Sequence, residues 1–214
     1  MKRASIIVLL ILIVDQIVKI WVKTHMEIGD SIPVLGNWFY LHFVENEGMA
    51  YGMKFGGDYG KLFLSVFRLI AIVGIGYYLF SIIRKKYHTM LIVSISFIFA
   101  GAIGNMIDSA FYGLIFSKSG PFTLAQFMPP EGGYETFLHG RVVDMFYFPI
   151  TEGIWPHWVP FIGGNHFAFF EPVFNIADAS ISVGVAILII FQKKFYVSKT
   201  LNVVDETDEI EDEY

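Results

Sequence analysis

Four apolar segments constrain this chain more than any other feature of its sequence. They cover residues 4–22, 62–83, 90–107 and 174–191, and each is close to the roughly 20 residues that a helix needs to cross a bilayer. Hydrophobic residues make up 55% of the 214 residues and charged residues only 16%, against about 25% in an ordinary soluble domain. The sequence therefore predicts an all-α membrane protein with four transmembrane helices.

The first segment follows Met1-Lys2-Arg3, a basic start that is also typical of a secretory signal peptide. It is longer than the apolar core of such a peptide, lacks a clear small-x-small cleavage site, and contains Asp15 and Lys19. We interpret it as a retained helix. Asp15 and Lys19 are four residues apart and share a helical face, so they either neutralise each other inside the bundle or take a direct part in a site.

The segments between the helices differ in character. Residues 24–60 combine short alternating apolar runs with glycine and proline, which predicts a small β element on the outer face of the membrane. Residues 109–173 are long, irregular and rich in glycine, proline and aromatic side chains, which is typical of an extended interfacial lid or platform. We expect residues 1–200 to form a single membrane-embedded domain and the acidic tail, 201–214, to be disordered.

The basic residues predict how the chain is oriented. Eight lie on one side of a four-helix arrangement, and the five on the other side are spread over much longer loops. By the positive-inside rule both termini are cytoplasmic. The eight are Lys2, Arg3, Arg84, Lys85, Lys86, Lys193, Lys194 and Lys199. Nothing in the sequence resembles a basic patch for nucleic acid, and the absence of cysteine excludes disulfides and thiolate chemistry.

Two carboxylates in apolar surroundings are the strongest candidates for chemistry. Asp178 lies just inside the last apolar segment, and Asp144 lies in the run Val142-Val143-Asp144-Met145-Phe146. A carboxylate beside hydrocarbon is costly and therefore indicates a functional site. Two such groups can share one proton and activate water as an aspartic dyad. The alternative is a pair of structural aspartates that cap helices.

Further polar residues gather at the same, outer end of the four-helix arrangement. Asparagine amides at positions 46, 105 and 175 can orient a substrate or the two aspartates without adding charge. We expect Asp108 to brace its loop rather than to react. Arg68 lies about two turns inside the second segment, where it either snorkels to the surface or pairs with a site carboxylate. Residues 45–52, at the end of the predicted β element, are compatible with a plain turn and with a binding loop.

Together these motifs resemble the signal peptidase II family, the bacterial prolipoprotein signal peptidases. Five blocks match in order along nearly the whole chain: Asp15-Gln16-Ile17-Val18-Lys19, residues 46–52, residues 101–108, residues 139–146 and Phe174-Asn175-Ile176-Ala177-Asp178. The resemblance implies an aspartic endopeptidase of the bacterial inner membrane whose site faces outward. It implies removal of the signal peptide from diacylglyceryl-modified prolipoproteins, just before the lipidated cysteine. It also implies contact with membrane lipids, inhibition by globomycin and no cofactor or metal, and a monomer suffices for the chemistry.

Carried over residue by residue, the resemblance makes Asp144 and Asp178 the catalytic dyad. The family usually has arginine where Ser109 stands, and Arg68 and Arg141 are the candidates to supply its charge. Two insertions, 114–138 and 147–170, separate the matching blocks and leave the lid geometry open. The residues that we expect to bind substrate or support the site are Asp15, Lys19, Asn46, Gly48, Arg68, Gly104, Asn105, Asp108, Arg141, Asn175 and Ala177.

Three other classes of protein fit part of the pattern. A small proton-coupled transporter also uses intramembrane acids, but it predicts acids through the membrane depth and often an internal repeat, and neither is visible here. A presenilin-like protease predicts a Gly-x-Gly-Asp signature that this chain lacks. A non-enzymatic assembly factor explains neither carboxylate.

Overall fold

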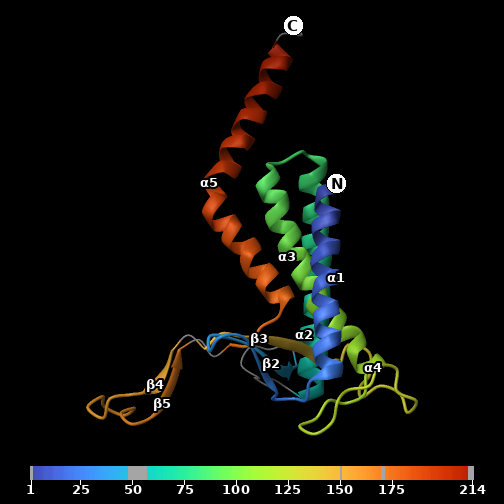
Figure 1. The fold of residues 1–214 in the computed structure, drawn as a ribbon. Helices are drawn as coiled ribbons and strands as arrows, with labels where there is room; N and C mark the ends of the chain where they lie inside the picture. Colours follow the sequence, from blue (N-terminus) through green and yellow to red (C-terminus); the bar gives the residue numbers. More distant parts are fainter. Residues whose placement is uncertain (1, 48–56, 150, 170–171, 212–214) are drawn as a thin grey trace. The chain divides into compact units, whose positions relative to one another are not determined.

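The computed structural model describes the backbone of residues 2–47, 57–149, 151–169 and 172–211. Gly48, one of the predicted site residues, lies outside these ranges. The described residues form four long helices, drawn as coiled ribbons in Figure 1. They are α1 (Lys2–His25), α2 (Gly57–Arg84), α3 (Thr89–Ile107) and α5 (Ile176–Glu211).

Each of the four predicted apolar segments corresponds to one long helix. The portions that are long and apolar enough to cross a membrane are Lys2–His25, Tyr59–Arg84, Thr89–Ile115 and Ile176–Phe195. The third passes from α3 through a π-helical turn, η2 (Asp108–Tyr112), into the short α4 (Gly113–Ile115). The prediction of four transmembrane helices is confirmed.

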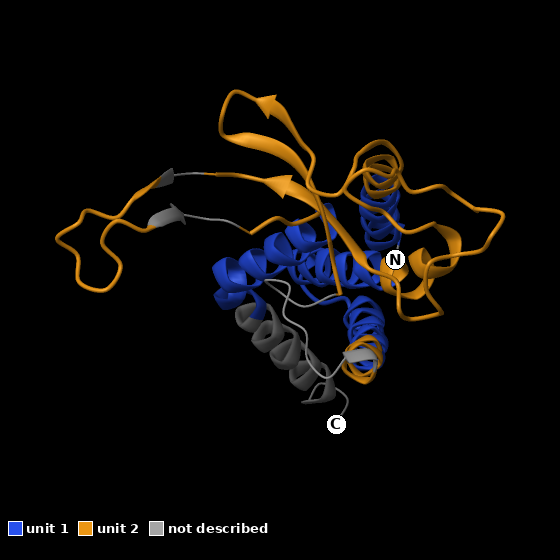
Figure 2. Cartoon of the chain, turned by 90° about the horizontal axis from the view of Figure 1, so that it is seen from below, with its two compact units in different colours: residues 1–16, 66–106, 176–214 blue, residues 17–65, 107–175 orange. Residues whose placement is uncertain are grey.

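The chain divides into two compact units, coloured separately in Figure 2. Unit 1 holds residues 1–16, 66–106 and 176–214. Its buried apolar cluster comes from α2 and α3, with Leu79, Ile82, Leu91 and Ile95 at the centre. Small residues let α3 and α5 approach closely, as is typical of helix pairs in membranes. A Cβ at Gly184 would meet the carbonyl oxygen of Ser94 at 2.7 Å, so this approach depends on glycine.

Unit 2 holds residues 17–65 and 107–175. Its antiparallel sheet has the order β1-β2-β3, formed by β1 (Ser31–Leu35), β2 (Phe39–Asn46) and β3 (Val142–Tyr147). One face of this sheet packs against the end of α1 and against η2 and α4, in a core of Val22, Met26, Phe43, Tyr112, Phe116, Val143 and Met145. The predicted β element is therefore present, and it gains a third strand from a segment about 100 residues further along the chain.

The stretch 109–173, expected to be irregular, contains regular structure besides β3. Strands β4 (Thr151–Ile154) and β5 (His166–Phe169) form a two-stranded antiparallel hairpin. The prediction missed it because the aromatic and proline-rich run shows no alternation of apolar and polar residues, the usual mark of a half-buried strand.

Helix α5 is helical as far as Glu211 and so enters the acidic tail, 201–214, for which we predicted disorder. Residues 185–211 contain no glycine or proline, so nothing in their sequence ends the helix. Residues 212–214 lie outside the described residues.

Candidate active site

Asp144 lies in the middle of β3 and is 3% exposed. Side chains alternate between the two faces of a strand, and the neighbours Val143 and Met145 enter the core of unit 2. Asp144 therefore lies on the opposite face, across from Val44 of β2 in the sheet register. The strand that fills the core also turns one carboxylate away from it.

Two asparagine amides hold the Asp144 carboxylate, one on each oxygen. Asn46, the last residue of β2, donates its amide to Oδ2. Asn175 donates to Oδ1 at 2.7 Å and also to the carbonyl oxygen of Val143 at 3.2 Å. The chain delivers Asn175 to this place because Phe174 and Phe146 exchange backbone hydrogen bonds of 3.1 and 2.7 Å.

Asp108 braces the same strand from behind. Its Oδ2 accepts a hydrogen bond from the backbone N–H of Val143 at 3.2 Å. The same oxygen forms an ion pair with Lys19 Nζ at 2.8 Å. The side chains of Asp108 and Lys19 are fully buried, so each needs the charge of the other. The expectation that Asp108 braces its loop rather than reacts stays a prediction.

Asp178 lies in the first turn of α5 and is held by a third asparagine. Asn105, in the last turn of α3, donates to Asp178 Oδ1 at 2.7 Å. Ser182 donates to the Asp178 carbonyl oxygen at 2.9 Å, one turn further along α5. The carboxylate thus lies at a helix N-terminus, where the unsatisfied N–H groups favour negative charge.

Asp15 caps the start of α5 from another helix. The Ala177 N–H, one of the free donors of the first turn, donates to Asp15 Oδ1 at 2.9 Å. Gln16 bridges Asp15 Oδ2 and the carbonyl oxygen of Gly104, at 3.1 and 3.4 Å. A Cβ at Gly104 would lie 2.9 Å from Asp15 Oδ2 and 3.0 Å from Ala177 Cβ. A larger residue at this position would therefore crowd the capping carboxylate.

A buried polar cluster that the sequence analysis missed lies beside Asn46. Glu45 pairs with Lys23, and Ser119 bonds both groups, with an Oγ–Oε1 distance of 2.9 Å and an Nζ–Oγ distance of 2.9 Å. Ser119 belongs to the insertion 114–138, so this cluster ties the insertion to α1 and β2. Asp15, Lys19 and Lys23 recur every four residues, and that repeat was the signal for a polar helix face.

Arg141 lies at the edge of this cluster. Its Nη1 is 3.9 Å from Glu45 Oε2, and its side chain is 29% exposed. Its backbone N–H donates to the Tyr134 hydroxyl oxygen at 2.7 Å, and burial raises the pKa of the Tyr134 phenol, which keeps it neutral. Arg68 is half-buried in α2, and Ser109 is buried in η2. The role of either arginine as a substitute for the family arginine stays a prediction.

The predicted site residues thus fall into two groups, one in each unit. The group of unit 2 is Lys19, Asn46, Asp108, Arg141, Asp144 and Asn175. The group of unit 1 is Asp15, Arg68, Gly104, Asn105, Ala177 and Asp178. Each group has one aspartate with asparagine amides on its carboxylate. In the described part of the chain no three His, Cys, Asp or Glu side chains form a group that could hold a metal ion.

Fold and site together define a multi-pass membrane protein with two amide-held aspartates. A family model described as signal peptidase (SPase) II matches residues 7–194. A lipoprotein signal peptidase of Porphyromonas gingivalis is 53% identical over 190 residues, which cover 88% of this chain and 82% of that protein. The lipoprotein signal peptidase of Amoebophilus asiaticus is 36% identical over 205 residues, which cover 94% of this chain and 82% of that protein. A solved structure described as a bacterial membrane enzyme aligns at 27% identity with a TM-score of 0.59, covering 91% of this chain and 89% of the other.

The chain belongs to the signal peptidase II family. It is a peptidase of the aspartic class that removes the signal peptide from prolipoproteins, and a multi-pass protein of the bacterial inner membrane. The comparisons give no support to the alternative of a proton-coupled transporter.

Proposed function

We propose that Asp144 and Asp178 are the catalytic dyad with which this peptidase cleaves the bond before a diacylglyceryl-modified cysteine. The observation that carries the proposal is that asparagine amides hold both carboxylates, Asn46 and Asn175 on Asp144 and Asn105 on Asp178. Amides fix the direction of a carboxylate without neutralising it. Both groups therefore keep the freedom to share and exchange a proton.

The chain itself supports bringing the two aspartates together. Asn175 bonds Asp144 directly, and only three peptide units separate Asn175 from Asp178. A fully extended chain of three residues spans at most about 11 Å. The residue that orients one aspartate is thus tethered closely to the other.

The chemistry requires one ionised and one protonated carboxyl group. Two carboxylates a few Å apart do not both ionise readily, so the pair shares a proton and titrates as a unit. The ionised group takes a proton from water as the water oxygen attacks the scissile carbonyl carbon. The protonated group donates its proton toward the carbonyl oxygen, and breakdown of the tetrahedral intermediate returns a proton to the leaving amine.

Dependence of cleavage on the substrate lipid tests this function. We expect purified protein in nanodiscs to cut a lipobox peptide whose cysteine carries diacylglycerol, with kcat/KM at least roughly 10²-fold above that for the unmodified peptide. Mass spectrometry should place the cut directly before the cysteine, and globomycin should inhibit it. Nanodiscs that hold one copy test whether a monomer suffices. Equal cleavage of the unmodified peptide, or a cut elsewhere, would contradict the proposal.

We also infer that both termini are cytoplasmic and that the site faces outward. Eight basic residues flank the helix ends on the side of the two termini, and such residues are enriched on the cytoplasmic side of a membrane. A fluorescent reporter that folds only in the cytoplasm should be bright when fused after Tyr214. A phosphatase that is active only outside should work when it is inserted after Glu131, in the insertion 114–138. The reverse pattern would overturn the four-helix topology.

A further inference from the structure

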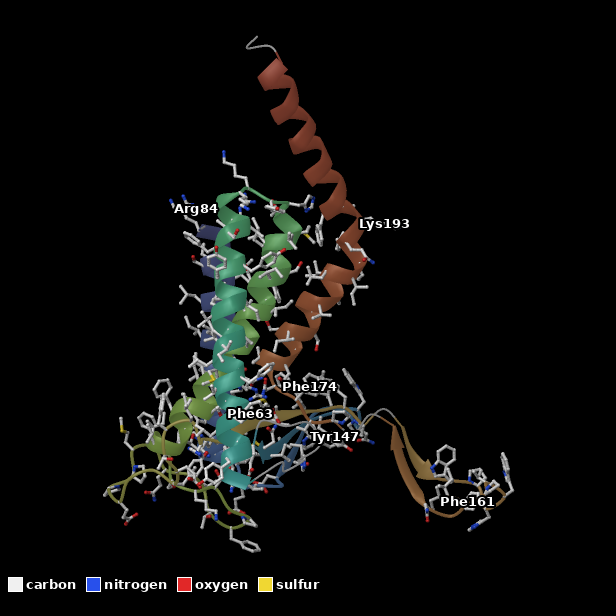
Figure 3. All side chains as sticks on the ribbon, turned by 180° about the vertical axis from the view of Figure 1, so that it is seen from behind. Phe63, Arg84, Tyr147, Phe161, Phe174 and Lys193 are labelled. Atoms are coloured by element: carbon white, nitrogen blue, oxygen red, sulfur yellow. The ribbon has the colours of Figure 1, made fainter. Side chains whose placement is uncertain are left out.

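The tip of the β4–β5 hairpin exposes large apolar side chains that no described element covers. Trp158 is 81% exposed, Ile154 65% and Phe161 104%. Figure 3 labels Phe161 on this hairpin. The sequence carries no Asp, Glu, Lys or Arg between Glu152 and Glu171. A solvated loop normally carries charge. An exposed surface of this composition is typical of a site that binds a membrane or another protein.

Several backbone groups of the tip bond to one another. Trp155 N–H donates to the Asn165 carbonyl oxygen at 2.9 Å, and Gly164 N–H donates back to the Trp155 carbonyl oxygen at 2.8 Å. Gly163 N–H donates to the Val159 carbonyl oxygen at 2.9 Å. Backbone groups that meet an apolar phase need such partners, because lipid offers none. The tip thus presents apolar side chains on a turn whose backbone is partly bonded internally.

Phe161 is fixed in this exposed position at a conformational cost. Its φ is +67°, in the left-handed region that bulky residues rarely adopt. The turn around it is tight, because a Cβ at Gly163 would meet the carbonyl oxygen of His157 at 2.7 Å, and Gly164 has φ +83°. Strain of this kind persists where a residue serves a function.

The hairpin is tethered close to the bilayer. Strand β5 ends at Phe169, and the membrane-spanning part of α5 begins at Ile176. Seven residues of chain reach at most about 25 Å, which keeps the base of the hairpin within that distance of the span. The short tether thus keeps the base of an apolar hairpin near the end of a membrane-spanning helix.

We propose that the tip of the β4–β5 hairpin is a membrane anchor that inserts Trp158 and Phe161 into the boundary between lipid headgroups and acyl chains. Tryptophan is enriched at this boundary because its ring is apolar and its N–H stays hydrated. Specific protein partners are instead selected largely by charged rims, and the tip carries no Asp, Glu, Lys or Arg. The anchor holds the sheet that carries Asp144 at the surface where a lipidated substrate arrives.

The absence of cysteine makes a direct test simple, because each added cysteine is a unique labelling site. Phe161→Cys and Trp158→Cys, labelled with the fluorophore NBD, are compared with Glu131→Cys, an exposed charged site in the same unit. The proteins are placed in nanodiscs of phosphatidylethanolamine and phosphatidylglycerol with or without nitroxide-labelled lipid. Cleavage of the lipidated peptide shows that each labelled protein is folded.

We expect NBD at both tip positions to emit at shorter wavelength and to lose roughly half of its fluorescence to the nitroxide lipid, as a group within the outer 5–10 Å of the bilayer should. NBD at position 131 should stay water-exposed and unquenched. Tip labels as water-exposed as the one at position 131 would overturn the anchor. A blue shift without quenching by nitroxide lipid would also overturn it, because it would mean that protein covers the tip.

Discussion

Asp144→Asn and Asp178→Asn should each lower kcat for a lipidated precursor by about 10³-fold or more. The substitution keeps the size and much of the hydrogen bonding of the side chain but removes the exchangeable proton and the base. The amides of Asn46, Asn175 and Asn105 would then face an amide instead of a carboxylate. Single-turnover cleavage in nanodiscs, followed by mass spectrometry, measures the loss.

The matched control is Asp30→Asn, an exposed aspartate of unit 2 whose Oδ2 accepts the Glu27 N–H at 2.8 Å. It removes the same charge outside the proposed site, so activity should change by less than about twofold. A dyad variant that melts at the wild-type temperature but does not cleave shows a catalytic loss. A dyad variant that cleaves at a rate near that of the control would contradict the assignment.

Gly101→Ala should be the most damaging small substitution in the membrane helices. A Cβ at this position would overlap the Ala177 carbonyl oxygen and lie 2.7 Å from Ile181 Cγ1. Both atoms belong to the first turns of α5, whose start also carries Asp178, so α5 has to shift. Overpacking costs about 1–3 kcal/mol, and a displacement near 1 Å at a catalytic group lowers the rate by about 10²-fold.

Gly74→Ala provides the comparison for Gly101→Ala. It places the same methyl group in α2 of the same unit, where a Cβ meets no described atom within 4 Å. We expect wild-type kcat/KM and an equal or higher melting temperature for Gly74→Ala, because alanine favours a helix over glycine. If the two variants lose activity to the same extent, the close approach of α3 and α5 is not what positions Asp178.

The transmembrane helices were predictable because their signal is local. A run of about 20 apolar residues needs no partner to be recognised, and the bilayer leaves few alternatives to a helix. The sheet was only half predictable. Strands β1 and β2 are neighbours in sequence, whereas β3 pairs with β2 across about 100 residues, and no local pattern specifies such a register.

The site shows the same division. The two aspartates stood out because carboxylates in apolar runs are costly, and the motif blocks added the asparagines. Which amide bonds which aspartate was not predictable from spacing. Asp15 illustrates the difficulty, since nothing in its spacing indicates that it caps Ala177, 162 residues away. The pairing of buried charges such as Lys23 and Glu45 can be recognised only in the folded structure, where the two side chains meet.

The most direct test of the dyad compares four proteins: the wild type, Asp144→Asn, Asp178→Asn and the double variant. Residues that act as one catalytic unit lose nearly everything when either is removed. The double variant should therefore cleave the lipidated precursor no more than a few-fold slower than the slower single variant, and EDTA should leave the wild-type rate unchanged. Two moderate losses that multiply in the double variant, or an EDTA-sensitive rate that zinc restores, would contradict an aspartic dyad.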